Sequence, residues 1–397
     1  MSGGGSQLQP LPPVAERVDR ELARMDGEVD WLLALSPIDN EAMWNAFADS
    51  GYRHLPELKY IDLEVDLGDV QRRLRALPVE EVESPLLEVL LGEKRRELER
   101  QVELVRLRGK EGFVAASVEL FGGVDPDLLR CAQDIMATVR PGAPLKADAG
   151  IDEVIEAVEA ERDWYRQEQP GFDFDVVVDT DLNSMMMVSH GTFYVDGDIR
   201  LPHARVQPLV QHEIGTHVVT RHNGGRQPLR QLQVGLADYD PLQEGLGVLA
   251  EYLAGFLPGE RLRVLAGRVV ATDMAMHGSG VPEIFDLLHG AHGMPTDDAF
   301  DIAVRALRGG GLTKDAVYLG GLRALLRHLA SGGGLADLYA GKFALRHLPM
   351  LRQLAANGWA AAPEVLPRFF SHPSFAERLE RCRSITVADL HHEVPVA

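Results

Sequence analysis

Hydrophobic residues recur at helical spacing along most of residues 14–140. In residues 84–108, apolar side chains repeat every three, four or seven positions, and Ser84 followed by Pro85 is typical of a helix start. The repeated positions are Leu87, Leu90, Leu91, Leu98 and Val102. Charged residues such as Glu93 and Glu97 fall on the other side, which we expect to be solvated surface. The pattern predicts amphipathic helices.

This pattern changes after residues 141–144, whose prolines and glycine interrupt the helical spacing. β-Branched and aromatic residues then dominate residues 174–178 and 185–195, which predicts strands. Beyond residue 201 the helical spacing returns. We therefore predict an α+β protein that is mostly helical, with a small β-sheet beside a large helical body.

The same changes in composition divide the chain into four parts. Residues 1–13 are rich in Gly, Ser, Gln and Pro, lack the basic start and apolar stretch of a secretory signal, and are expected to form a disordered lead-in. Residues 14–140 form an N-terminal helical region, residues 145–385 a second region, and residues 386–397 a C-terminal tail.

Composition narrows the classes of partner. The 397 residues are 45% hydrophobic, which is enough for a sizeable core. Acidic residues number 60 and basic residues 40, so a formal net charge of -20 argues against nucleic acid and anionic membranes as partners. No run approaches the roughly 18 apolar residues of a membrane span. Two cysteines far apart, Cys131 and Cys382, favour a reducing, cytoplasmic location.

The glycine-rich segments do not predict a nucleotide site. Gly341-Lys342 matches part of the sequence motif of a phosphate-binding loop, but Phe343 follows it in place of Ser or Thr. No predicted strand precedes this segment. We therefore assign it no function from sequence.

Two histidines that flank a glutamate carry the strongest chemical signal. They lie in a segment with helical spacing that ends at residues 223–225, and the full stretch is His212-Glu213-Ile214-Gly215-Thr216-His217. Zinc hydrolases commonly place two residues between the glutamate and the second histidine, so that both imidazoles share one helix face. Here there are three.

The additional residue has a geometric consequence. In a regular helix, positions five apart differ by roughly 140° around the axis, compared with roughly 40° for positions four apart. His212 and His217 can share one metal ion only if the helix widens locally, as a π-type bulge does. Gly215 lies inside the interval, where its lack of a side chain eases the distortion. The spacing therefore predicts a π-type bulge.

A third ligand is expected from a second helix that Asp240 and Pro241 begin. Glu244 would complete a site of two histidines and one glutamate, with a fourth position open for water. Glu251 lies seven residues further along, on the same helix face, and is the alternative. Whichever acid is not the ligand is expected to orient a histidine.

These motifs resemble those of the family that contains the microtubule-associated tyrosine carboxypeptidases, whose bacterial members are labelled flavohemoglobin expression-modulating QEGLA motif proteins. The likeness covers nearly all of the chain except its ends. It rests on the histidine motif, on Asn223-Gly224 with Gln227-Pro228-Leu229, on Gln243-Glu244-Gly245-Leu246, and on Arg308-Gly309-Gly310-Gly311 with Thr313-Lys314-Asp315 and Tyr318-Leu319.

The resemblance implies a zincin-like metallopeptidase fold with the small sheet beside the active-site helix, residues 145–385 forming the catalytic domain. It implies zinc ligands at His212, His217 and Glu244, a catalytic carboxylate at Glu213, and carboxypeptidase action on a peptide or protein C-terminus. At Gly247 the family's name would place Ala. We expect this difference of one methyl to affect packing more than metal coordination.

A hydrolytic mechanism follows as a hypothesis. Zinc would activate a water molecule, and Glu213 would act as general base. Tyr318 is the first choice for a donor to the oxyanion and His222 the second. Tyr318 lies four residues after Lys314, so that the two share a face if the segment is helical.

A carboxypeptidase also needs a cation for the terminal carboxylate of its substrate. The candidates near the motifs are Arg205, Arg221, Arg226, Arg230, Arg308 and Lys314, and the sequence does not select among them.

Three alternatives remain open from sequence. The protein could be a non-catalytic binding or regulatory protein that zinc stabilises, although such a closed site has no need of Glu213. It could also be a hydrolase of a non-peptide amide. Finally, the strand segment 185–191, with its three methionines, either borders the site and pairs with an extended peptide or packs as core.

Overall fold

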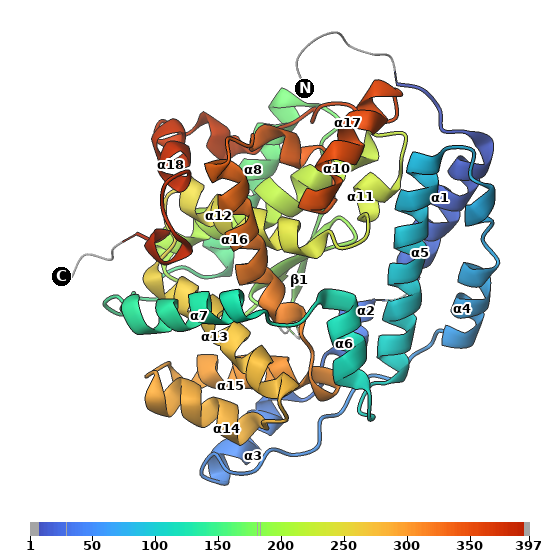
Figure 1. The fold of residues 1–397 in the computed structure, drawn as a ribbon. Coiled ribbons are helices and arrows are strands. Elements are labelled where there is room, and N and C mark those ends of the chain that lie inside the picture. Colours follow the sequence, from blue (N-terminus) through green and yellow to red (C-terminus); the bar gives the residue numbers. More distant parts are fainter. Residues whose placement is uncertain (1–7, 29, 181, 183, 393–397) are drawn as a thin grey trace.

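The structure, a computed structural model, describes residues 8–28, 30–180, 182 and 184–392. It is mostly helical and contains one three-stranded sheet, which confirms the predicted α+β class (Figure 1). The helices before the sheet are α1 (Pro13–Asp26), α2 (Trp31–Leu35), α3 (Asn40–Asp49), α4 (Leu67–Arg75), α5 (Pro85–Arg106), α6 (Phe113–Phe121), α7 (Pro126–Thr138) and α8 (Ile151–Glu168). The α-helices after it are α9 (His203–His212), α10 (Val219–Gly225), α11 (Gln231–Val234), α12 (Asp240–Ala254), α13 (Gly259–Met276), α14 (Val281–Phe285), α15 (Thr296–Leu307), α16 (Val317–Ala330), α17 (Leu348–Ala356) and α18 (Phe375–Cys382).

Shorter helical segments complete the architecture. Two are π-helical, η2 (Glu213–Val218) and η3 (Asp286–Ala291). The 3-10 turns are η1 (Val79–Glu81), η4 (Arg308–Gly310), η5 (Lys314–Ala316), η6 (Ala336–Tyr339), η7 (Leu345–His347), η8 (Arg368–Ser371) and η9 (Val387–Asp389).

The sheet has the order β1-β3-β2, with β1 (Asp175–Asp179) parallel and β2 (Met186–Ser189) antiparallel to β3 (Thr192–Asp196). The predicted strand at residues 174–178 thus matches β1 with an offset of one residue. The predicted segment 185–195 is a hairpin of two strands, because His190 and Gly191 turn the chain with φ values of 49° and 94°. Strand β2 is an edge strand and packs against η2.

Helix α5 shows how the predicted pattern becomes structure. It begins at Pro85, and Leu87, Leu90 and Leu98 of its apolar face are fully buried. The expectation for the charged face is wrong at Glu97, which is only 6% exposed. Lys94, completely buried, pairs with Glu97 at 2.8 Å and with Asp26 of α1 at 2.9 Å, so this ion-pair group connects the two helices.

The hydrophobic core is continuous across the predicted boundary at residues 141–144. One cluster of buried side chains extends from Leu11 to Leu390. Residues 1–7 of the predicted lead-in and 393–397 of the predicted tail lie outside the described residues. The four-part division itself stays a prediction. Within the described part of the chain, every helix is too short or too polar to cross a bilayer.

Two glycines set the close crossing of α12 and α16 near the centre of the molecule (Figure 1). A Cβ at Gly245 would lie 2.6 Å from the backbone carbon of Gly321, and one at Gly321 would lie 1.7 Å from the carbonyl oxygen of Pro241. The two backbones can approach this closely only because neither position carries a side chain. The crossing brings Tyr318 of α16 close to Glu244 of α12, whose charge helps raise the pKa of the tyrosine.

Candidate metal centre

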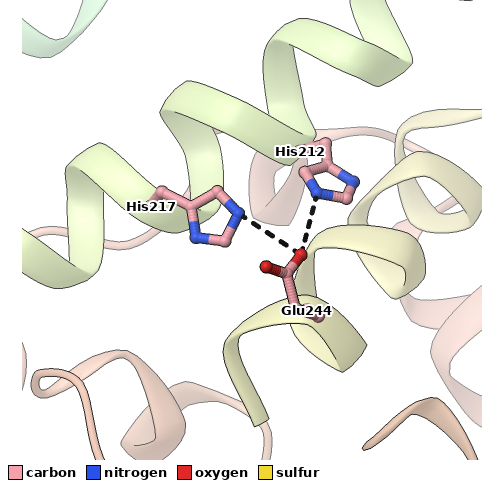
Figure 2. Close-up of side chains that lie close together, drawn as sticks. All are labelled: His212, His217 and Glu244. Atoms are coloured by element: carbon pink, nitrogen blue, oxygen red, sulfur yellow. Dashed lines mark ion pairs between the residues drawn. The ribbon is translucent and has the colours of Figure 1, made fainter. Parts of the chain in front are cut away.

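The predicted π-type bulge is present between the two histidines. Helix α9 ends at His212, η2 continues as a π-helical turn from Glu213 to Val218, and α10 resumes the regular α-helix. The wider turn places the imidazole rings of His212 and His217 on the same side, with centroids 5.4 Å apart (Figure 2). The five-residue spacing of the two histidines is therefore compatible with a shared ion.

Glu244 of α12 points between the two rings (Figure 2). Its Oε2 lies 3.8 Å from Nε2 of His212 and 3.9 Å from Nε2 of His217. Two ligand atoms on one tetrahedral zinc ion are separated by about 3.4 Å, as estimated from bond lengths near 2.1 Å. One donor atom from each of the three residues lies within 4.8 Å of the others, so a small contraction would suffice to bind one ion.

Glu251, the alternative ligand, instead forms a hydrogen bond with His212, the contact expected of an acid that orients a histidine. The Nδ1–H of His212 donates to Oε1 of Glu251 at 2.9 Å and leaves Nε2 directed toward Glu244. Glu251 is completely buried, and Arg261 and Arg205 pair with it at 3.3 and 3.5 Å. Although burial disfavours the charged form of Glu251, Arg261 and His212 lower its pKa to about 2.

The two histidines differ in protonation. Burial disfavours the imidazolium of His212, but the nearby carboxylates of Glu244 and Glu251 outweigh burial and raise its pKa to about 10. Burial lowers the pKa of His217 to about 3, because the nearby charge of Glu244 does not compensate. Glu244 stays ionised: burial opposes its charge, yet the nearby His212 and the charge of Lys314 help lower its pKa to about 2. The metal-free site thus holds one charged and one neutral imidazole.

Glu213 lies next to this group with a pKa suited to proton transfer. Burial, together with the charges of Glu244 and Glu251, raises the pKa of Glu213 to about 7, while His212 and the backbone N–H of Val188 act in the opposite direction. Val188 belongs to β2. Of the two interpretations of the segment 185–191, the structure therefore favours a strand that borders the site.

The residues around Glu244 each have a distinct packing role. Gln243 accepts a hydrogen bond from the hydroxyl of Thr220 at 2.7 Å, which ties α12 to α10, and Leu246 is completely buried. Gly247 faces the His212 ring, and a Cβ there would lie 2.5 Å from Nε2. An additional methyl at this position would therefore act on the candidate ligand itself, contrary to the expectation from sequence.

Tyr318 and Lys314 both lie close enough to Glu244 for their charges to interact with it. Burial and the charge of Glu244 raise the pKa of Tyr318 to about 12, so its phenol stays protonated and can donate a hydrogen bond. The Lys314 ammonium pairs with Asp240 at 2.6 Å. Although burial opposes its charge, Asp240 and Glu244 raise its pKa.

The other two predicted binding residues have different surroundings. Arg308 lies near Arg305 and Asp315, and burial lowers its pKa to about 10. The ring of His222 packs on Phe172 with centroids 5.0 Å apart, and its Nε2 lies 3.7 Å from Glu364. Among the described residues, neither forms an ion pair or a side-chain hydrogen bond with a candidate ligand. Their roles in substrate binding stay predictions.

Lys342 is a neighbour of the site to which the sequence assigned no function. Its Nζ lies 5.7 Å from the ring centroid of Tyr239, and its charge is one of the factors that lower the pKa of His217. A pairing of distant segments places it there: the Lys342 N–H donates to Leu232 O at 2.7 Å, and its carbonyl accepts from Leu236 N at 3.0 Å. Local sequence carries no signal for this pairing.

Two imidazoles and a carboxylate that converge from two helices define a candidate metal centre. A family model described as microtubule-associated tyrosine carboxypeptidase matches residues 45–386, which is most of the chain, and the chain belongs to this family. No curated protein matches it. Among solved structures, the chain is similar to "the putative lipoprotein from Colwellia psychrerythraea", with 12% identity and a TM-score of 0.43 over 85% of this chain and 72% of that chain.

Proposed function

We propose that this protein is a zinc-dependent metallopeptidase of zincin-like fold that acts as a carboxypeptidase on peptide or protein C-termini. The observation that carries the proposal is the convergence of His212, His217 and Glu244 across the π-helical turn. This donor set of two imidazoles and one carboxylate fits zinc. Membership in a family named for tyrosine carboxypeptidases supports the hydrolysis of a peptide bond and its location at the C-terminus of the substrate.

An open coordination position distinguishes the proposed enzyme from a protein that zinc merely stabilises. Among the residues that the structure describes, no further His, Cys, Asp or Glu joins the three candidate ligands. Structural zinc sites usually have four protein ligands, whereas catalytic sites have three and a water molecule. A zinc ion bound here would activate that water for attack on the scissile carbonyl.

Glu213 is the proposed general base. Its carboxylate lies beside the candidate ligands, and its pKa of about 7 in the metal-free protein is close to neutral. We expect it to accept the proton of the attacking water and to pass it to the departing amine, so that the peptide bond gives a shortened peptide and a free amino acid.

Tyr318 is the proposed donor to the oxyanion that forms on the scissile carbonyl. Its phenol stays protonated near neutral pH and lies beside Glu244. The cation of Arg268 lies 5.2 Å from the centroid of the Tyr318 ring and helps to fix its orientation. A preorganised donor of this kind typically contributes about 10² to 10³ in rate.

The test combines metal analysis with peptide hydrolysis. The purified zinc-loaded protein should release the last residue from peptides that differ only at that residue. The Glu213→Gln variant should keep zinc and lose at least about 10²-fold in turnover. Near wild-type turnover by this variant would contradict the assignment of the base, and release of internal fragments would contradict carboxypeptidase action.

A further inference from the structure

Two cations beside the candidate metal centre have no acidic partner. Lys342 and Arg221 form no ion pair and no side-chain hydrogen bond with any residue that the structure describes, and the contact of the Lys342 side chain is with the face of the Tyr239 ring. The charge of Lys342 acts on His217 and on Glu244, and the charge of Arg221 acts on Lys342. Arg221 lies four residues after His217 on the helix that continues from η2 into α10, and Tyr239, which Lys342 contacts, directly precedes α12 with Glu244. Each cation is therefore attached to an element that carries a candidate ligand or lies next to one.

The acids nearest to this pair are already engaged. Asp26 pairs with Lys94 at 2.9 Å, and Asp240 pairs with Lys314 at 2.6 Å. Glu244 is a candidate metal ligand. The protein therefore offers Lys342 and Arg221 no free carboxylate of its own.

Leaving two like charges partly buried without a partner is unfavourable. Burial lowers the pKa of Lys342 to about 8, and the charge of Arg221 contributes to this shift. Burial also lowers the pKa of Arg221. An anion from outside the chain would relieve this cost, because it would interact with both cations at once.

Both side chains are held in place by backbone geometry. Arg221 packs across the hairpin turn at Gly191, where a Cβ would lie 2.5 Å from its Nε. Backbone hydrogen bonds to Leu232 and Leu236 fix the backbone of Lys342, and its ammonium lies over the ring of Tyr239. The pair therefore forms a preorganised cationic site rather than two mobile surface charges.

Three of the other cations suggested by the sequence pair with acids. Arg205 pairs with Glu251 at 3.5 Å. Arg226 pairs with Glu364 at 3.0 Å. Lys314, as described above, pairs with Asp240. Arg268 and Arg308 also form no ion pair among the described residues, but the charge of Asp315 acts on both, and Arg268 lies against the Tyr318 ring. Of the unpaired cations, Arg221 lies four residues after His217, and Lys342 contacts Tyr239, which directly precedes α12.

We propose that Lys342 and Arg221 together bind the terminal carboxylate of the peptide substrate. The inference rests on the proposed carboxypeptidase function. The terminal carboxylate lies one residue beyond the scissile bond, a Cα–Cα step of about 3.8 Å, so its binding group must lie beside the metal centre. The substrate is accordingly a peptide with a free α-carboxylate, and a C-terminal amide is a poor ligand.

Binding to an inactive protein tests the inference without turnover. In the zinc-loaded Glu213→Gln protein, a fluorescent hexapeptide that ends in a free tyrosine carboxylate should bind at least about tenfold more tightly than its C-terminal amide. Lys342→Met or Arg221→Met, introduced into this background, should each reduce that preference about tenfold. Lys342→Arg, which keeps the charge, should restore most of it.

Arg226→Met is the matched control, since Arg226 lies five residues from Arg221 and already pairs with Glu364. This variant should leave the preference for the free carboxylate unchanged. If Lys342→Met and Arg221→Met fold, bind zinc and keep the full preference, the inference is overturned. Selective binding without hydrolysis by the Glu213-containing protein would instead contradict the proposed function and leave the carboxylate site standing.

Discussion

The imidazole of His212 lies directly against Gly247, so close that a side chain at position 247 requires the ring or the helix to shift. A Cβ there would lie 2.5 Å from Nε2, 2.6 Å from Cε1 and 2.7 Å from Cδ2 of His212. The ring is held on its other nitrogen by Glu251 at 2.9 Å. The ring therefore has little freedom to move aside.

Gly247→Ala should weaken zinc binding by about tenfold or more, because the new methyl displaces a ligand from its position. Competition with a chromogenic chelator would measure the affinity. Gly320→Ala is the control, since a Cβ at Gly320 would meet only Leu128 at an ordinary 3.6 Å. Equal zinc affinities for wild type and Gly247→Ala would show that the ring is not constrained as described.

Gly245→Ala should act on stability instead. The new Cβ would lie 2.6 Å from the backbone of Gly321, so α12 and α16 would have to separate. We expect a loss of about 1 to 3 kcal/mol in the free energy of unfolding, which is typical of overpacking. Urea unfolding of the metal-free proteins measures this loss. A stability equal to that of Gly320→Ala would contradict the close crossing.

Zinc binding should release a proton and strengthen with pH. The pKa of His212 is about 10 in the metal-free protein, so near pH 8 its imidazole is protonated and must lose a proton to bind metal. Between pH 7 and 9 the apparent affinity should rise about tenfold per pH unit for the one proton displaced. Calorimetry in buffers with different ionisation enthalpies would count the protons. A count of zero protons released would contradict the prediction that zinc replaces a proton on His212.

Glu251→Gln should reduce zinc affinity about 10- to 100-fold while leaving all three ligands in place. Glutamine keeps an acceptor for the Nδ1–H of His212 but removes the charge that Arg205 and Arg261 pair with. Glu260→Gln, at an exposed position of α13, should leave affinity unchanged. Equal zinc affinities for the two variants would show that the charge of Glu251 does not support metal binding.

Local sequence was sufficient for features that depend on spacing alone. The five-residue step from His212 to His217 required a wider helical turn, and η2 is that turn. The apolar repeats of residues 84–108 likewise predicted α5. Such features follow from helix geometry and need no knowledge of distant residues.

Features that depend on contacts between distant segments could not be predicted from local sequence. The burial of Glu97 follows from Lys94 meeting Asp26 of α1, and the position of Lys342 follows from its pairing with residues 232–236. The ring contact at Gly247 depends on how α12 crosses α9. Likewise, tertiary contacts determine which arginines have no ion-pair partner.

The central claim is that His212, His217 and Glu244 bind one ion together. The most direct measurement is the zinc content of purified protein after equilibration with limiting zinc. The account predicts one zinc per chain for the wild type and for Glu213→Gln, and at least about 10²-fold weaker binding for His217→Ala and for Glu244→Ala. Undiminished binding of one zinc by a folded His217→Ala protein would contradict it.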